Sequence, residues 1–172
     1  MTRAVAGERR RDQRVVSIAD ARRLASQPAD FFAHSWHAMQ HIERDRLEAL
    51  QLASLRLRLT ELRDRIPVLR TMASEQGIDE ITEIDEIVPL LFQHSVYKSY
   101  PPSLLANNRF GHLTRWLDRL TTYDLSAVDV EDCDTIDSWL DVLDSQTELR
   151  VAHSSGTAGT MSFLPRSADE WD

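Results

Sequence analysis

The stretch ELRVAHSSGTAGTMSFL, residues 148–164, decides how the fold ends. Glu148–His153 carries apolar residues bounded by polar ones and predicts a strand. Small residues then fill Ser154–Thr160, and Met161–Leu164 alternates between apolar and polar side chains. Two short strands separated by a glycine-containing turn are typical of a β-hairpin. The sequence therefore predicts a hairpin near the C-terminus.

Upstream of the hairpin, the spacing of leucines indicates helices. Apolar residues recur three and four positions apart, which is the pattern of one helix face; they are Leu52, Leu55, Leu59, Leu62, Ile66 and Leu69. We expect Pro28 to open this long helical stretch, Pro67 to kink or restart it, and Gly77 to cap it. The apolar face could form a coiled-coil dimer or pack within its own domain. Its shortness favours the second interpretation, since a coiled coil needs three to four heptads.

Four shorter helices are also predicted. They cover Ser17–Ala25, Thr82–Phe92, Phe110–Leu120 and a stretch from a cap at Asp134 to about Asp144. The length of 172 residues fits one domain with a sizeable core. We expect a mainly α fold with a C-terminal β-hairpin, built from residues 28–172 and preceded by a polar, flexible lead over residues 1–27.

The composition limits the partners that the chain can have. The net charge is −8 and the isoelectric point about 5.2. Nucleic-acid binding needs clustered positive charge, so we expect no nucleic-acid partner and interpret the seven arginines of residues 3–23 as a solvated terminus. No apolar stretch approaches the ~20 residues that span a bilayer, and no secretory signal is evident, so no membrane partner is expected. The single cysteine, Cys133, suits a reducing compartment, and we expect a cytoplasmic protein.

The predicted turn has a composition that suits phosphate. Gly156 and Gly159 lie three positions apart, with Ser and Thr around them. Glycine allows backbone angles that point amide N–H groups inward, and hydroxyls add donors for phosphate oxygens. On composition alone, a plain Gly- and Ser-rich hairpin turn is the alternative. The P-loop pattern G-x-x-x-x-G-K-[ST] is absent, and the one lysine of the chain is Lys98.

The motif S-S-G-T-A-G at residues 154–159 resembles the phosphate loop S-[ST]-G-[TS]-[TSA]-G of the adenylate-forming (acyl-activating) superfamily. Two upstream elements are similar to those of its phenylacetate–CoA ligase and acyl-protein synthetase branch. They are Ile66–Arg70 followed by Gly77-Ile78, and the Tyr-Pro element Tyr97–Pro101. The order and spacing of these elements match the N-terminal portion of that family, so the resemblance implies the helical front of an adenylate-forming domain.

The resemblance also implies an ATP-dependent acid–thiol ligase. In that family a carboxylic-acid substrate attacks the α-phosphate of ATP, giving an acyl-adenylate and pyrophosphate, and a thiol or other nucleophile then takes the acyl group. ATP and Mg²⁺ would be cofactors of the complete enzyme. The loop would hold the β- and γ-phosphates and stabilise the leaving pyrophosphate electrostatically. Its residues are Ser154, Ser155, Gly156, Thr157, Ala158, Gly159 and Thr160.

Two departures from the family pattern bear on activity. Many relatives carry Lys shortly after the second glycine, where this chain has Thr160–Phe163, and Arg166 is the candidate for supplying charge. The sequence ends at Asp172, before the family's adenine pocket, Mg²⁺-binding carboxylates and mobile C-terminal lysine. We therefore assign no catalytic residue, and expect this polypeptide alone to be inactive and to bind no cofactor tightly. The remainder of the enzyme, as a separate chain, is a candidate partner.

A non-enzymatic helical interaction module with a purely structural hairpin is the alternative function. Three histidines, His34, His37 and His41, share one face of a predicted helix, but no carboxylate or cysteine converges on them, so no metal site is expected. The acidic residues of segment 129–137 lack the EF-hand spacing. Cys133 lies in that segment, whose charge would raise its pKa and disfavour a thiolate.

Overall fold

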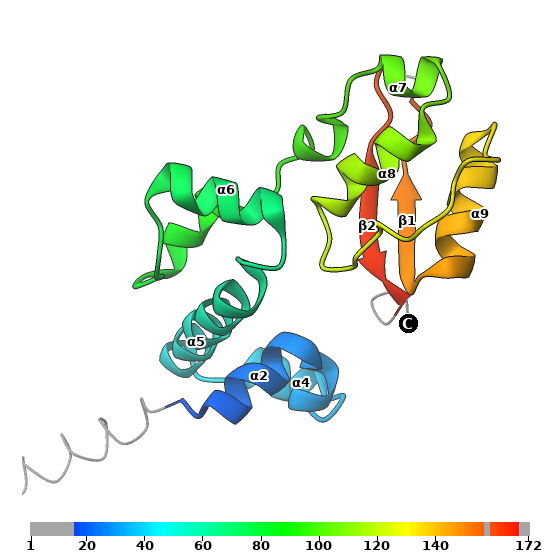
Figure 1. The fold of residues 1–172 in the computed structure, drawn as a ribbon. Helices are drawn as coiled ribbons and strands as arrows, with labels where there is room; N and C mark the ends of the chain where they lie inside the picture. Colours follow the sequence, from blue (N-terminus) through cyan, green and yellow to red (C-terminus); the bar gives the residue numbers. More distant parts are fainter. Residues whose placement is uncertain (1–15, 157–158, 169–172) are drawn as a thin grey trace, which may run out of the picture. The chain divides into compact units, whose positions relative to one another are not determined.

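A computed structural model describes residues 16–156 and 159–168 of the chain. The fold is mainly helical and ends in a two-stranded antiparallel hairpin, which confirms the class expected from the sequence. Length alone suggested one domain, whereas the chain divides into two compact units (Figure 1). The first contains the chain up to Arg63 together with Met72–Leu90, and the second contains Asp64–Thr71 and the chain from Leu91 onward.

Helices make up the described part of the first unit. They are α2 (Ile18–Ser26), α3 (Pro28–Phe31), α4 (Trp36–His41), α5 (Arg44–Leu62), the second half of α6 (Pro67–Gln76), and the 3₁₀ helix η1 (Ile84–Leu90). Pro28 begins a helix as expected, but the single long helix predicted after it is wrong. The chain leaves helical geometry at Ala33 and His34, whose φ angles are 50° and 54°, and again at Ile42 and Glu43. Side-chain periodicity alone does not reveal these breaks.

Helix α2 belongs to the packed part of the first unit. The Ser17 hydroxyl accepts a hydrogen bond from the amide of Asp20 and caps the helix, as is usual for serine at this position. Ala21 is buried, and its carbonyl accepts a 2.9 Å hydrogen bond from the buried Ser54 hydroxyl on α5. Residues 16–27 are therefore not the flexible lead that their polarity suggested. Residues 1–15 of the proposed lead lie outside the described part of the chain.

Helix α5 is covered on two opposite faces, which explains why its leucines do not form one stripe. Leu50 and Ser54 are buried on the side that packs against α2. At about 100° per residue, Arg56 and Leu59 lie on roughly the opposite side. There the Arg56 guanidinium donates to the Ile81 carbonyl, and Leu59 is buried. The predicted stripe also crosses a helix boundary, because α5 ends at Leu62 and a new helix begins at Pro67.

Gly77 ends α6 as the sequence predicts. Its φ is +65°, which a residue with a Cβ adopts only at a cost. The amide of Ile78 donates to the Ala73 carbonyl at 2.9 Å, and that of Gly77 to the Ser74 carbonyl at 3.2 Å. These two bonds form a Schellman motif, which satisfies carbonyls left open by the last turn of the helix.

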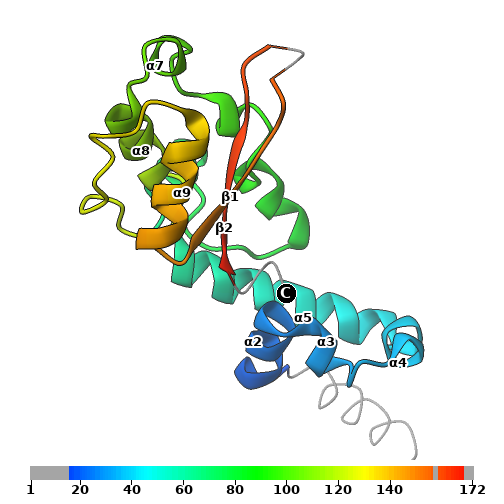
Figure 2. The same ribbon diagram turned by 90° about the vertical axis from the view of Figure 1, so that its right-hand side faces the viewer.

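The second unit encloses a core between two helices and the hairpin. Its elements are the start of α6, η2 (Val96–Lys98), α7 (Ser103–Ala106), α8 (Phe110–Asp118), α9 (Ile136–Gln146), β1 (Leu149–His153) and β2 (Phe163–Ser167). In Figure 2, α8 and α9 lie on the same side of the hairpin. Trp139 of α9 and Phe163 of β2 are both fully buried, and their rings meet edge to face at 5.2 Å. Packing of this aromatic pair fixes the hairpin against the helices.

The strand register sets which hairpin side chains face the core. Leu149 pairs with Ser167, Val151 with Pro165, and His153 with Phe163. Because side chains alternate between faces, these residues share the face that carries the buried Leu149 and Phe163. The predicted second strand, Met161–Leu164, is two residues too early at its start. Pro165 is tolerated because the strand has a partner on one side only within the described residues.

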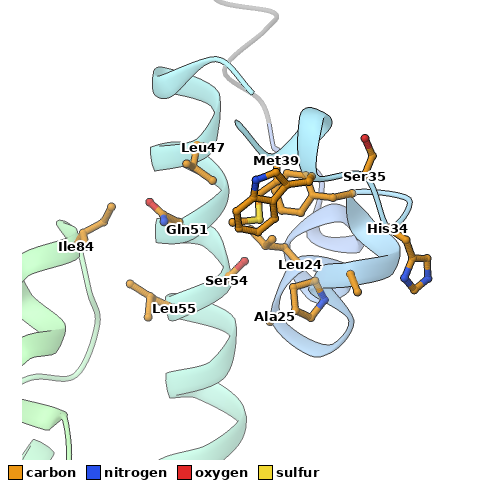
Figure 3. A pocket seen from close by; sticks show the side chains of 14 residues that line it. Leu24, Ala25, His34, Ser35, Met39, Leu47, Gln51, Ser54, Leu55 and Ile84 are labelled. Atoms are coloured by element: carbon orange, nitrogen blue, oxygen red, sulfur yellow. The ribbon is translucent and has the colours of Figure 1, made fainter. Parts of the chain in front are cut away.

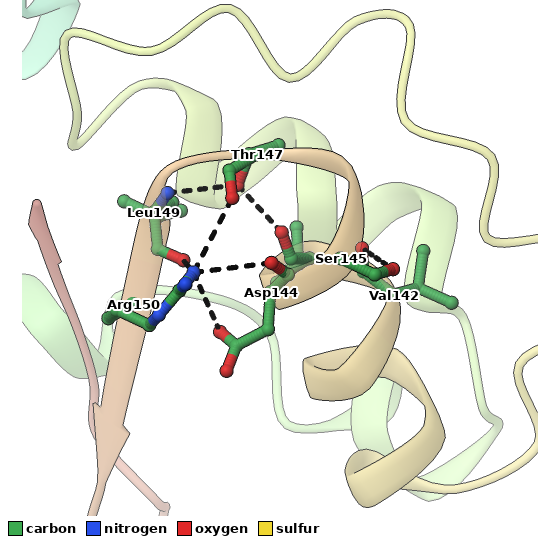
Figure 4. Close-up of polar contacts among 7 residues, drawn as sticks. Val142, Asp144, Ser145, Thr147, Leu149 and Arg150 are labelled. Carbon is green, nitrogen blue, oxygen red and sulfur yellow. Dashed lines mark hydrogen bonds and ion pairs between the residues drawn. The ribbon is translucent and has the colours of Figure 1, made fainter. Parts of the chain in front are cut away.

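Helix α9 is capped at both ends. Its N-cap is Thr135 rather than the predicted Asp134, since Thr135 and Ser138 exchange side-chain to backbone hydrogen bonds of 3.1 Å in a capping box. At the C-terminus, Arg150 Nη1 donates to the carbonyls of Asp144, Thr147 and Leu149 at 3.2, 3.4 and 3.0 Å (Figure 4). A cation at this end also interacts favourably with the helix dipole.

The segment after α6 differs from the predicted helix over Thr82–Phe92. It is the 3₁₀ helix η1, and Pro89 lies inside it. Proline lacks the amide that an α-helix needs at that position, so a regular helix cannot continue through it. None of the helices within the described residues has the length and apolar character to traverse a bilayer.

Candidate functional site

The predicted phosphate loop lies between the two strands, at the end of the hairpin opposite Leu149 and Ser167 (Figure 1). Five of its seven residues are described: Ser154, Ser155, Gly156, Gly159 and Thr160. Thr157 and Ala158 lie outside the described residues. The hairpin therefore brings the described candidates together in one loop, as the sequence predicts.

The two glycines have different surroundings. Both have positive φ, +69° at Gly156 and +127° at Gly159, so side chains at either position would strain the backbone. A Cβ at Gly156 would lie 2.6 Å from Cγ of Met161, so that glycine lies beneath the Met161 side chain. A Cβ at Gly159 would meet no described atom within 4 Å. Gly156 therefore accommodates a contact inside the loop, whereas the backbone at Gly159 is open to a ligand.

Part of the hydrogen-bonding capacity of the loop is used within the hairpin. The amide of Ser154 donates to the Ser162 carbonyl at 3.1 Å, and the amide of Ser162 donates to the Ser154 hydroxyl at 3.0 Å. The amide of Gly159 donates to the Gly156 carbonyl at 2.9 Å. These bonds narrow the set of groups that could hold an anion, and they make Ser154 a residue that closes the base of the loop.

Other donors of the loop remain available within the described part of the chain. There, the amides of Gly156, Thr160 and Met161 have no hydrogen-bond partner. Thr160 is half-buried and adds a hydroxyl, which can donate to a phosphate oxygen. The arrangement thus presents neutral N–H and O–H donors rather than a cationic side chain.

A tyrosine outside the loop, Tyr100, forms a hydrogen bond with the residue that follows the loop, Met161. The Tyr100 hydroxyl donates to the carbonyl of Met161 at 2.8 Å, across 61 residues of sequence. Tyr100 belongs to the Tyr-Pro element noted in the sequence, but nothing in the local pattern indicated that it reaches the loop. Its ring packs against Trp116 and Phe163, with centroid distances of 4.9 and 5.7 Å.

The suggestion that Arg166 supplies positive charge to the loop is wrong. Arg166 lies opposite Arg150 in the sheet, three residues beyond Phe163, which is about 10 Å along the strand. It is also on the face opposite Phe163. Burial raises the pKa of the Tyr97 hydroxyl, and the positive charge of Arg166 opposes this rise. The imidazole of His153 lies next to the loop, with its Nδ1 3.3 Å from the Ser154 carbonyl oxygen.

The three histidines of the first unit do not all share one helix face, because only His37 and His41 belong to α4. His34 precedes α4 and its Nε2 lies 2.8 Å from Asp30 Oδ1, while the rings of His37 and His41 stack at 3.8 Å. No group of three His, Cys, Asp or Glu side chains converges within the described residues. Burial is the main cause of the raised pKa of Cys133, and the neighbouring carboxylates Asp132, Asp129 and Asp134 add to it. The direction agrees with the sequence prediction, although the largest cause is different.

The first unit also carries an apolar groove of about 910 Å³ along α5 (Figure 3). Helices α2, α3 and α4, the turn between α3 and α4, and Ile84 of η1 contribute its other walls. The residues that line it are Leu24, Ala25, Pro28, Ala29, Phe32, His34, Ser35, Trp36, Met39, Leu47, Gln51, Ser54, Leu55 and Ile84. Trp36 and Met39 are 69% and 46% exposed, which is unusual for such large apolar side chains and marks a candidate interaction surface.

Comparison with known proteins found no match for this chain among protein-family models, curated proteins or solved structures.

Proposed function

We propose that the loop Ser154–Thr160 binds the polyphosphate of ATP, and that the chain is the N-terminal part of an ATP-dependent acyl-adenylating ligase. The observation that carries the proposal is the backbone of the loop. Gly156 and Gly159 both have positive φ, and the amides of Gly156 and Thr160 have no partner within the described residues. Backbone N–H groups presented by such turns form anion-binding concavities.

The chemistry follows from where negative charge develops. When a carboxylate oxygen attacks the α-phosphorus of ATP, the bond from that phosphorus to the bridging oxygen breaks. Pyrophosphate then leaves with both electrons of that bond, and an acyl-adenylate forms. Donors fixed around the β- and γ-phosphates stabilise this departing charge. The loop would contribute by positioning and electrostatic stabilisation, and the acyl group would pass to a thiol in a second step.

The described residues do not assemble a metal site for Mg²⁺. Within its described part, no three potential ligands come together. Mg²⁺ usually binds through one or two carboxylates together with substrate phosphates, so it would arrive with ATP. No step of the proposed reaction is assigned to a metal held by these residues.

The test is a titration of the chain with Mg·ATP and with tripolyphosphate. Binding is monitored by NMR through the backbone amide resonances of Gly156, Gly159 and Thr160. We expect saturable shifts at these three residues. Gly156→Val and Gly159→Val should weaken binding by roughly tenfold or more, because valine strains a positive-φ backbone and fills the loop.

Gly77→Val is the matched control for that titration. Gly77 has nearly the same φ as Gly156, +65° against +69°, but lies at the end of α6 in the first unit. It should therefore cost folding stability without changing phosphate affinity. An unchanged affinity in both loop variants, or equal losses in the loop variants and the control, would remove the basis for the proposal.

A second candidate function is a helical interaction module, which the groove of the first unit favours. Trp36→Ala and Met39→Ser should then abolish binding of an apolar probe such as 1-anilinonaphthalene-8-sulfonate, whereas Gly156→Val should leave it unchanged. Val88→Ser is the control, since Val88 is 60% exposed in the same unit and does not line the groove. If Trp36→Ala and Val88→Ser reduce probe binding equally, the result would count against a binding site in the groove.

A further inference from the structure

Tyr100 is placed to control the shape of the loop. Its side chain is almost wholly buried, with 2% of the residue exposed. Trp116 and Phe163 contact its ring and hold it in position, so its hydroxyl has little freedom. That hydroxyl donates to the Met161 carbonyl at 2.8 Å. Burial raises the pKa of Tyr100 above its ordinary value, so the hydroxyl remains a donor throughout the neutral range.

Met161, whose carbonyl Tyr100 holds, also contacts the interior of the loop through its side chain. Its side chain occupies the space that a Cβ at Gly156 would need, 2.6 Å from the Cγ atom. The amide of the next residue, Ser162, donates to the Ser154 hydroxyl and closes the base of the loop. Two contacts shape the loop: the Met161 side chain lies over Gly156, and the Ser162 amide bonds to the Ser154 hydroxyl. The Met161 carbonyl, which Tyr100 holds, lies in the chain between the Met161 side chain and the Ser162 amide.

We propose that Tyr100 is a positioning residue for polyphosphate binding, which holds the loop in its binding conformation through the Met161 carbonyl before the ligand arrives. This inference rests on the proposed function of the loop. A loop rich in Gly and Ser has many accessible conformations, and affinity falls in proportion to the fraction of molecules whose loop is competent to bind. An internal hydrogen bond from a rigid donor raises that fraction without touching the ligand.

The test compares Tyr100→Phe with Ser99→Ala. The phenylalanine keeps the ring in the core and removes only the hydroxyl that reaches Met161. Ser99→Ala removes two neighbouring hydrogen bonds, the 3.0 Å bond from Trp116 Nε1 to the Ser99 hydroxyl and the 2.8 Å bond from that hydroxyl to the Val96 carbonyl, and neither involves a loop residue. The readouts are tripolyphosphate affinity, hydrogen exchange of the Ser162 amide, and unfolding by urea.

We expect Tyr100→Phe to weaken tripolyphosphate binding by roughly three- to tenfold, the effect of losing one net hydrogen bond. The Ser162 amide should also exchange faster. Ser99→Ala should leave affinity and exchange unchanged, even where it lowers stability as much as Tyr100→Phe does. If Tyr100 had only a general structural role, both variants would instead show lower stability, faster Ser162 exchange and weaker tripolyphosphate binding together.

The outcomes separate this inference from the function on which it rests. Wild-type affinity in Tyr100→Phe, with binding still lost in Gly156→Val, would overturn the role of Tyr100 and leave the loop as the phosphate site. Equal loss of affinity in Tyr100→Phe and Ser99→Ala would also overturn it, because the effect would follow stability. No binding of tripolyphosphate by the wild-type chain would remove both proposals.

Discussion

The indole N–H of Trp139 donates to the hydroxyl of Thr114 at 2.9 Å, and this bond joins α9 to α8 inside the core. Trp139 is fully buried, and Thr114 is 4% exposed. The Thr114 hydroxyl in turn donates to the Phe110 carbonyl one turn earlier in its own helix, at 2.9 Å. Threonine in the middle of a helix is thus explained by its tertiary partner, since it gives the buried indole the acceptor that it requires.

Thr114→Val should destabilise the second unit by about 1–3 kcal/mol, because it leaves the buried indole N–H without an acceptor while keeping the shape of the side chain. Thr114→Ser keeps the hydroxyl and removes one methyl group, and should cost about 1 kcal/mol. Urea unfolding followed by the fluorescence of the tryptophans measures both. Valine that is tolerated as well as serine would show that the hydrogen bond contributes little.

The contact between Gly156 and Met161 predicts a coupling between two substitutions. Gly156→Ala places a methyl group 2.6 Å from Met161 Cγ, which is too close for two carbon atoms, and adds a side chain at a φ of +69°. Met161→Ala removes the obstructing atoms. Gly156→Ala should therefore cost at least about 0.5 kcal/mol less in the Met161→Ala background than in the wild type. Urea unfolding of the four proteins measures this difference, and additivity within about 0.3 kcal/mol would contradict the contact.

Local sequence patterns were sufficient to predict the helices and strands that bury a single face. The hairpin was predictable from the alternation around its turn, and α8 and α9 from their apolar spacing, because each presents one side to the core. The leucines of α5 gave a wrong prediction of one apolar face, because α2 and the segment around Ile81 cover opposite sides of that helix. The breaks at Ala33 and His34 had no sequence signal, since left-handed backbone at non-glycine residues is set by tertiary context.

The position of the loop was predictable, and its internal arrangement was not. Small residues between two strands identified the turn, and both glycines have the positive φ that the composition suggested. The anchor from Tyr100 to Met161 joins residues 61 positions apart, so only the packing of its ring against Phe163 brings them together. The same packing logic excludes Arg166 from the loop, because strand register places it on the other face.

Arg150 should contribute through its planar guanidinium rather than its charge alone. Its Nη1 donates to three carbonyls around the end of α9, and the Asp144 carboxylate lies 3.8 Å away. Arg150→Met keeps the apolar stem and should cost about 1 kcal/mol, while Arg150→Lys should recover only part of this because its ammonium lies one bond nearer the backbone than Nη1 and reaches the three carbonyls less well. Thermal unfolding measures both, and the exposed Arg70→Met is the control. Equal stability of Arg150→Lys and wild type would indicate a purely electrostatic role.

Glu86 should make the first unit sensitive to acid. Its carboxylate accepts hydrogen bonds from the amides of Thr82 and Glu83 and from the Thr82 hydroxyl. The backbone bond from Thr82, then that from Glu83, lowers the pKa of Glu86 from its ordinary 4.5. A carboxyl whose pKa is lower in the folded state stabilises it fully above the unfolded pKa, and this contribution is lost as pH falls through the folded pKa.

The amide resonances of Thr82 and Glu83 should therefore titrate with a midpoint below 4.5, and Glu86→Gln should abolish this titration. The wild type should be more stable than Glu86→Gln at pH 7, and the difference should shrink as pH falls below about 4.5, because only the ionised wild-type side chain is favoured. Glu75→Gln, at an exposed position of α6 in the same unit, controls for the loss of one negative charge. A midpoint at or above 4.5 would show that these hydrogen bonds do not favour the ionised carboxylate.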